Sequence, residues 1–101
     1  MADPIPTADH CTTMAEVRAA IDAYDRRIVT LLAERMRYIE AAARIKQDRD
    51  AVRDEARKAE VIDHAAAVAL EEGFPPVLVR AIYDLLVEGS IAHELERFDA
   101  R

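Results

Sequence analysis

The sequence predicts an all-α protein with one long helix and two shorter ones, and three observations support this prediction. Of the 101 residues, 20 are Ala, the strongest helix former. All four Pro and both Gly lie outside residues 7–72, so 66 consecutive residues lack the two strongest helix breakers. Apolar residues recur there at the spacing of a helix face, and no run alternates as a strand does. The fold is therefore expected to be built from helices alone.

The long helix is predicted to begin after Thr13 and to end near Asp48. Thr13 and Glu16 have the spacing of a capping box, in which a hydroxyl and a carboxylate satisfy the first free N–H groups. From Met14 onward, one set of positions is separated by alternating steps of three and four residues. We call this set the heptad stripe: Met14, Val17, Ile21, Tyr24, Ile28, Leu31, Arg35, Tyr38, Ala42 and Ile45. A helix of roughly 35 residues is about 50 Å long.

Two shorter helices are predicted after a polar connection at residues 47–51. Asp54 is the expected N-cap of a helix that runs to Glu72, and Gly73 is its expected left-handed stop. Gly73-Phe74-Pro75-Pro76 is a strong turn, and proline at the first helical position opens a last helix that runs to about Phe98.

These helices are expected to form one domain, residues 13–101, preceded by a flexible N-terminal arm at residues 1–12. A chain of about 100 residues is too short to build two cores. The two shorter helices can cover only part of the long one, so the rest of the heptad stripe needs an apolar partner. The sequence thus predicts a homodimer in which the long helices pair. The alternative is a monomeric three-helix bundle with a protruding helix.

Composition argues against several classes of function. The net charge of −6 does not favour non-specific nucleic-acid binding, which needs a basic face. No window approaches the roughly 20 apolar residues of a membrane span, and no signal-peptide pattern is visible, so a cytoplasmic protein is expected. Cys11 stands alone, and no Cys and His run has zinc spacing, so no metal site is expected. Nucleophile-elbow and nucleotide-binding motifs are missing, which argues against a cofactor.

Four cations interrupt or flank the apolar pattern. Arg35 occupies a stripe position where Leu or Ile is expected, and Lys46 falls within about 20° of it on the helix wheel. Arg18 flanks the stripe, and Arg57 lies one turn into the second helix. Because guanidinium groups bind carboxylates in a bidentate manner, the set predicts a pocket for an anion with more than one carboxylate. The alternative is interhelical ion pairing, for which the acidic candidates are Glu16, Asp25 and Glu40.

Together these residues resemble the all-helical chorismate mutase family, which includes the related isochorismate pyruvate lyases. The resemblance covers nearly the whole chain and rests on five short motifs. They are Met14-x-x-Val17-Arg18-x-x-Ile21-Asp22, Leu31-Leu32-x-x-Arg35, Ile45-Lys46, Val52-Arg53-Asp54-x-x-Arg57, and Ser90 with an acidic residue four positions later. The resemblance implies an intertwined homodimer with two sites, each completed by Arg18 from the partner.

The resemblance also implies a role for each site residue. Three arginines would hold the two carboxylates of a small dicarboxylate substrate: Arg18, Arg35 and Arg57. Ser90 would assist near the ring carboxylate, and Lys46 and Glu94 would address the ether oxygen. Asp54 would lie near the ring hydroxyl. Lys46, Glu94 and Arg35 are the expected catalytic residues.

Two positions depart from the family's pattern. Glu94 stands where mutases commonly have Gln, and a carboxylate beside the departing oxygen would repel the developing charge. Glu94 is therefore expected to work protonated, with activity falling as the pH rises. Lys58 stands where mutases usually place a Glu that binds the ring hydroxyl. It is expected either to contact the substrate, to pair with Glu94 or to turn to solvent.

Three functions remain open, in a definite order. The leading prediction is a chorismate mutase, which rearranges chorismate to prephenate, because Val52-Arg53-Asp54 is mutase-like. The alternative is an isochorismate pyruvate lyase, which gives salicylate and pyruvate, because His10-Cys11-Thr12 and the stretch from Tyr38 to Lys46 are more lyase-like. The third is a non-catalytic helical dimerisation module.

Overall fold

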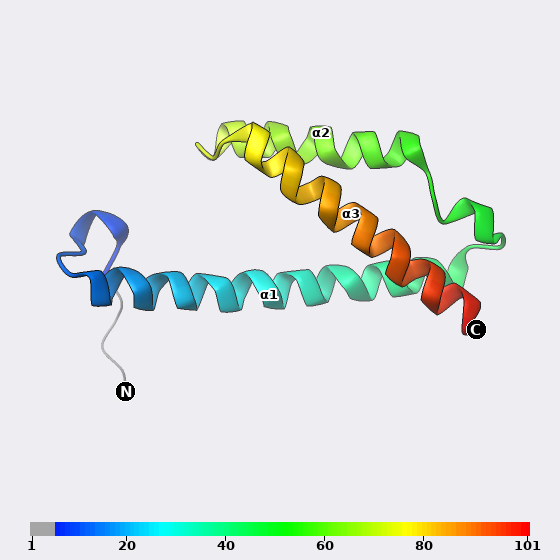
Figure 1. Cartoon of the computed structure of the whole chain (residues 1–101), viewed down its shortest axis with the longest axis horizontal. Helices are drawn as coiled ribbons and strands as arrows, with labels where there is room; N and C mark the ends of the chain where they lie inside the picture. The colour runs from blue at the N-terminus through cyan, green and yellow to red at the C-terminus, as the bar shows by residue number, and fades with distance from the viewer. Residues whose placement is uncertain (1–5) are drawn as a thin grey trace. The chain divides into compact units, whose positions relative to one another are not determined.

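The computed structural model describes residues 6–101, and these residues form helices and connections without a strand (Figure 1). The three α-helices are α1 (Met14–Ile45), α2 (Glu55–Glu71) and α3 (Pro76–Asp99). Short 3-10 helices, η1 (Ala8–His10) and η2 (Arg49–Ala51), precede α1 and α2. The all-α prediction is confirmed. The first five residues of the expected N-terminal arm lie outside the described residues. In residues 6–101, no helix is long and apolar enough to span a membrane.

The start of α1 is the predicted capping box. The Glu16 carboxylate accepts hydrogen bonds from the backbone N–H groups of Thr12 and Thr13 at 3.0 and 3.1 Å. In return, the backbone N–H of Glu16 donates to Thr13 Oγ1 at 3.2 Å. These bonds satisfy donors that have no partner inside the helix, which is why α1 begins here. They also lower the pKa of Glu16, the Thr12 backbone bond contributing most.

The end of α1 differs from the prediction. The helix ends at Ile45 rather than near Asp48. The Lys46 N–H still donates to Ala42 O at 2.9 Å, but beyond it the carbonyl groups turn to another donor. The Arg101 guanidinium donates to Ala43 O at 3.0 Å and to Lys46 O at 2.6 Å. This distant side chain takes the place of the helical N–H groups that a longer α1 would supply.

The remaining helix ends follow local signals. The Asp54 side chain accepts the Arg57 N–H at 3.0 Å, which confirms the predicted N-cap of α2. Gly73 has a φ of 72°, and the Phe74 N–H donates to Ala69 O at 2.8 Å across it. This is the left-handed helix stop predicted for glycine. Pro76 opens α3, as expected of proline at the first helical position.

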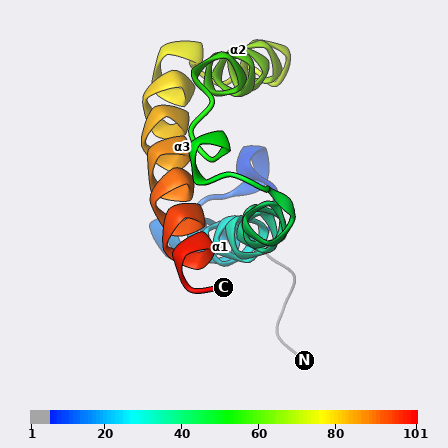
Figure 2. The same cartoon turned by 90° about the vertical axis from the view of Figure 1, so that its right-hand side faces the viewer.

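Two parts of the chain are compact, and we describe each by itself. The N-terminal part ends at Arg35, and the C-terminal part is Met36–Arg101, so α1 begins in one and ends in the other. In the C-terminal part, α2 packs against α3, and small buried residues such as Ala66 and Ala69 allow a close approach. The segment between α1 and α2 runs beside α3 (Figure 2), where Val52 joins a core cluster with Val87 and Ile91.

The N-terminal part leaves most of its heptad stripe exposed. Five stripe residues are more than half exposed: Met14, Ile21, Tyr24, Ile28 and Leu31. Residues 6–8 and Cys11 fold back towards the first turns of α1 and line an open pocket of about 520 Å³ together with Val17, Ile21 and Tyr24. The pairing of this stripe with a second chain stays a prediction.

Candidate functional site

In the C-terminal part, an ion pair joins the half-buried Lys46 to the buried Glu94. Lys46 directly follows α1, and its Nζ lies 2.8 Å from Oε2 of Glu94 on α3. Glu94 is only 4% exposed. No hydrogen bond with suitable geometry reaches Oε2 in the described structure, so the contact is an ion pair alone. A carboxylate removed from water is costly unless a charge partner stands beside it, and Lys46 is that partner.

Ser90 lies one helical turn before Glu94 on the same side of α3. It too is only 4% exposed, and its hydroxyl donates to Leu86 O at 2.8 Å. Their i,i+4 spacing places the two side chains next to one another along the helix. The structure therefore places Ser90 and Glu94 side by side in the buried stretch of α3, with Lys46 against Glu94.

The start of α2 supplies two more predicted residues, Asp54 and Arg57. Asp54 uses its carboxylate to cap the helix, so one of its oxygens is engaged with the Arg57 N–H. The Arg57 side chain is 68% exposed, and its nearest acidic partner is Glu60 at 3.4 Å, one turn along the same helix. Such an exposed pair contributes little to stability, so Arg57 can exchange it for a ligand carboxylate at small cost.

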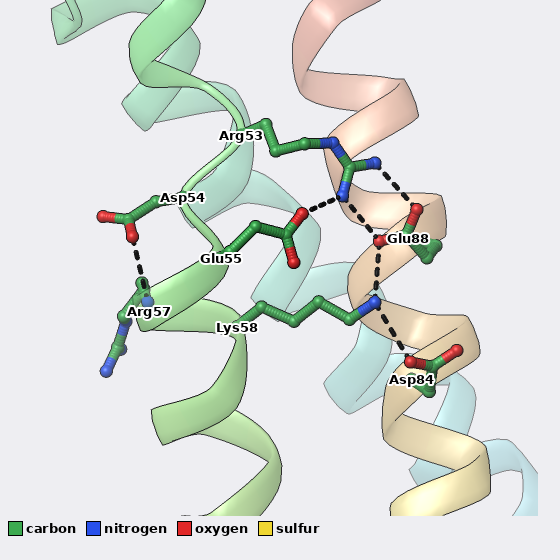
Figure 3. Close-up of polar contacts among 7 residues, drawn as sticks. All are labelled: Arg53, Asp54, Glu55, Arg57, Lys58, Asp84 and Glu88. Atoms are coloured by element: carbon green, nitrogen blue, oxygen red, sulfur yellow. Dashed lines mark hydrogen bonds and ion pairs between the residues drawn. The ribbon is translucent and has the colours of Figure 1, made fainter.

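Lys58 lies in a charged cluster that joins α2 to α3 (Figure 3). Its Nζ is 2.9 Å from Glu88 and 3.0 Å from Asp84, and its side chain is 18% exposed. The predicted alternatives of pairing with Glu94 and of turning to solvent were therefore wrong. Asp84 and Glu88 lie one turn apart on α3, so they present two carboxylates to one ammonium across the helix interface. Contact between Lys58 and a substrate stays a prediction.

Arg53 completes the same cluster from the connection before α2. Its guanidinium donates to both carboxylate oxygens of Glu88, at 2.7 and 3.0 Å, and to Glu55 at 2.8 Å. The bonds from Arg53, and then those from Lys58, lower the pKa of Glu88 from 4.5 to about 2. Glu88, in turn, is the main reason why the pKa of Lys58 is raised. Sequence reasoning missed Glu88; its only signal was the i,i+4 spacing from Asp84.

Comparison with known proteins shows the family to which the chain belongs. The family model described as "Chorismate mutase type II" matches residues 17–95. The chain belongs to this family. The isochorismate pyruvate lyase of Pseudomonas aeruginosa is 32% identical over 90 residues, which cover 89% of both chains. The eight predicted site residues fall within the matched range, but membership alone does not distinguish mutase from lyase activity.

The other two predicted arginines belong to the N-terminal part of this chorismate mutase-type chain. Arg18 is exposed, and Arg35 is partly buried although it occupies a stripe position. Two acidic candidates for pairing with the cations are engaged elsewhere: Glu16 in the capping box, and Glu40 with His93 at 2.8 Å. Lys46 is itself ion-paired with Glu94, so the ion-pairing alternative stays open beside the anion pocket. A shared pocket of Arg18 and Arg35 with Lys46 stays a prediction.

Proposed function

We propose that the protein is a chorismate mutase that acts as an intertwined homodimer. The observation that carries this proposal is the ion pair of Lys46 with the buried Glu94, which places a cation beside a carboxyl group that is removed from water. The reaction is a [3,3] rearrangement in which a C–O bond breaks and a C–C bond forms within one molecule. Because C–O cleavage runs ahead, negative charge builds on the ether oxygen. A fixed ammonium stabilises that charge more strongly in such a site than in water.

Glu94 needs a proton in this mechanism. An ionised carboxylate only accepts hydrogen bonds, and so does an ether oxygen. Lys46 and Glu94 neutralise one another in the free protein, whereas a substrate that accepts a hydrogen bond from each requires protonated Glu94. Proton uptake by Glu94 would therefore accompany substrate binding.

The substrate carboxylates would be held by arginines around this pair. Arg57 contributes from the first turn of α2, Arg35 from α1, and Arg18 from the partner chain. Bidentate contacts select the folded conformer in which the reacting carbons approach each other. Ser90 would assist beside the ring carboxylate, and Asp54 would lie near the ring hydroxyl.

The exposed heptad stripe supports the proposed homodimer. Five of its apolar residues are each more than half exposed, and they recur at the spacing by which long helices pair: Met14, Ile21, Tyr24, Ile28 and Leu31. A second copy of the chain offers the same stripe. Pairing would remove this surface from water and complete each site with Arg18.

A second candidate is isochorismate pyruvate lyase activity in the same pocket. The relative from Pseudomonas aeruginosa carries that name at 32% identity over 89% of both chains. In addition, Lys58 occupies the position at which mutases usually read the ring hydroxyl, and that hydroxyl distinguishes chorismate from isochorismate. The lyase would release pyruvate and leave salicylate.

The test supplies each substrate separately to the purified protein. Prephenate from chorismate, without salicylate from isochorismate, supports the mutase. If salicylate forms from isochorismate much faster than any prephenate forms from chorismate, the protein is the lyase and the mutase proposal fails. Arg35→Ala is expected to abolish turnover, whereas the matched control Arg37→Ala, at an exposed position two residues away, retains it. A wild-type chain that turns over neither substrate and does not bind a dicarboxylate transition-state mimic would be a non-catalytic module.

A further inference from the structure

The main chain around Lys46 is held by a side chain 55 residues away. One nitrogen of the Arg101 guanidinium, Nη1, donates to Ala43 O at 3.0 Å and to Lys46 O at 2.6 Å. The other, Nη2, donates to Gln47 O at 3.4 Å. Arg101 thus binds carbonyl groups before, at and after Lys46.

Arg101 suits this role for physical reasons. The last carbonyl groups of an α-helix have no intrahelical donor and carry partial negative charge. A guanidinium supplies several N–H donors in a rigid plane together with a positive charge, so one side chain can satisfy several carbonyl groups. The guanidinium also lies over the Phe98 ring, 3.7 Å from its centroid, which restricts the orientation of the plane.

A second contact restrains the same connection further along. Arg49 donates to both carboxylate oxygens of Asp99, at 2.9 and 3.2 Å, and lowers the pKa of Asp99. Val52, three residues later, is buried in the core against α3. The end of α3 therefore fixes the connection on the C-terminal side of Lys46, while Arg101 is bonded to the carbonyl of Lys46 itself.

We propose that Arg101 is a positioning residue, which holds the backbone of Lys46 so that its ammonium stays at the reacting ether oxygen. The proposal rests on the proposed function. Lys46 lies just outside α1, and its four-carbon stem is flexible, so only its backbone contacts and Glu94 fix its position. A displacement of about 1 Å at such a group costs up to about 100-fold in rate.

The test compares Arg101→Met and Arg101→Lys with the control Arg97→Met. Arg97 lies one turn earlier on α3 and pairs with Glu40 rather than with the carbonyl groups around Lys46. In Arg101→Met we expect kcat to fall roughly ten- to 100-fold with KM changed little, because Lys46 acts in the transition state and the arginines bind the ground state. Arg101→Lys keeps the positive charge without the planar donors, so its kcat is expected to be almost as low as that of Arg101→Met. Arg97→Met is expected to retain wild-type kcat.

Amide hydrogen exchange provides a readout that does not depend on turnover. The Lys46 N–H, bonded to Ala42 O at 2.9 Å, is expected to exchange faster in both Arg101 variants and unchanged in Arg97→Met. Equal kcat in Arg101→Met and Arg97→Met, with both proteins folded by circular dichroism, would overturn the proposal. If the wild type converts neither substrate, the proposed function fails by itself. Faster exchange of the Lys46 N–H in the Arg101 variants would then still support the role of Arg101 in holding the backbone of Lys46. Unchanged exchange would overturn that role.

Discussion

The two parts of the chain treat charge and apolar surface in opposite ways. In the N-terminal part, apolar stripe residues such as Ile28 and Leu31 face water, and the cation Arg35 occupies a stripe position. In the C-terminal part, charged residues cross the helix interfaces as close pairs, and one of them, Glu94, is buried. Under the proposed function, the first part would assemble the homodimer and the second would position the chemical groups.

The small core of the described chain supports this interpretation. The buried apolar residues are three alanines, two valines and one isoleucine, and none of the larger side chains in residues 6–101 is fully buried. Burial of apolar area is the main favourable contribution to folding, at roughly 25 cal/mol per Å². Because this chain buries so little apolar area by itself, a second copy that covers the heptad stripe would add to its free energy of folding.

Breaking the assembly should have the largest effect. Ile28→Glu places a charge in the middle of the heptad stripe, where pairing would bury it without a partner. We expect the variant to be monomeric by sedimentation and inactive, because Arg18 would no longer enter the partner's site. Ala33→Glu, on the opposite face of α1, is the matched control and should remain dimeric. A dimeric, active Ile28→Glu protein, or a monomeric wild type, would contradict the pairing of these helices.

Removing the cation of the buried pair should have the next largest effect. Lys46→Met is expected to lower kcat by about 100- to 1000-fold, because the charge on the ether oxygen loses its stabilising partner. It should also lower the free energy of unfolding by about 1–3 kcal/mol, since Glu94 would lose its ion-pair partner. The double variant Lys46→Met/Glu94→Gln separates the two effects, because it should regain stability in chemical denaturation without regaining activity. Recovery of activity in that variant would exclude Lys46 from the chemistry.

The fold was largely predictable because its boundaries depend on local signals. Gly73 and Pro76 set the turn between α2 and α3 through their own backbone preferences. The partner of Lys58 was not predictable, because it depends on how α2 packs against α3, and the sequence near Lys58 does not determine this packing. The end of α1 at Ile45 was not predictable either. The side chain that binds the carbonyl groups there, Arg101, lies 55 residues from Lys46 in the sequence.

The pH dependence of the reaction tests the role of Glu94. We expect kcat/KM of the wild type to fall as the pH rises between about 5 and 8, because the protonated form of Glu94 is the active one. Glu94→Gln carries a permanent N–H donor and should give a flatter profile. Gln has nearly the same size and shape as Glu, so the fold should persist. A wild-type profile that is flat over this range would show that Glu94 acts without a proton.

The charged cluster between α2 and α3 should give the smallest effect, seen in stability rather than in rate. The pKa of Glu88 is about 2 in the folded chain against an ordinary value of 4.5, so its contribution is complete above pH 4.5 and is lost as the pH falls towards 2. Glu88→Gln should lower the Tm near pH 7 and should reduce the loss of Tm between pH 4.5 and 2. Asp63→Asn, which removes an exposed pair with Arg80, is the control and should change the Tm less.

The same variant bears on the role of Lys58. With Glu88 neutralised, Lys58 keeps only Asp84 as a charged partner in this cluster. If Lys58 contacts the substrate, its looser attachment should change KM for one of the two substrates along with the Tm. If the cluster only joins α2 to α3, Glu88→Gln should lower the Tm and leave both KM values as they are, because no residue in contact with the substrate is then disturbed.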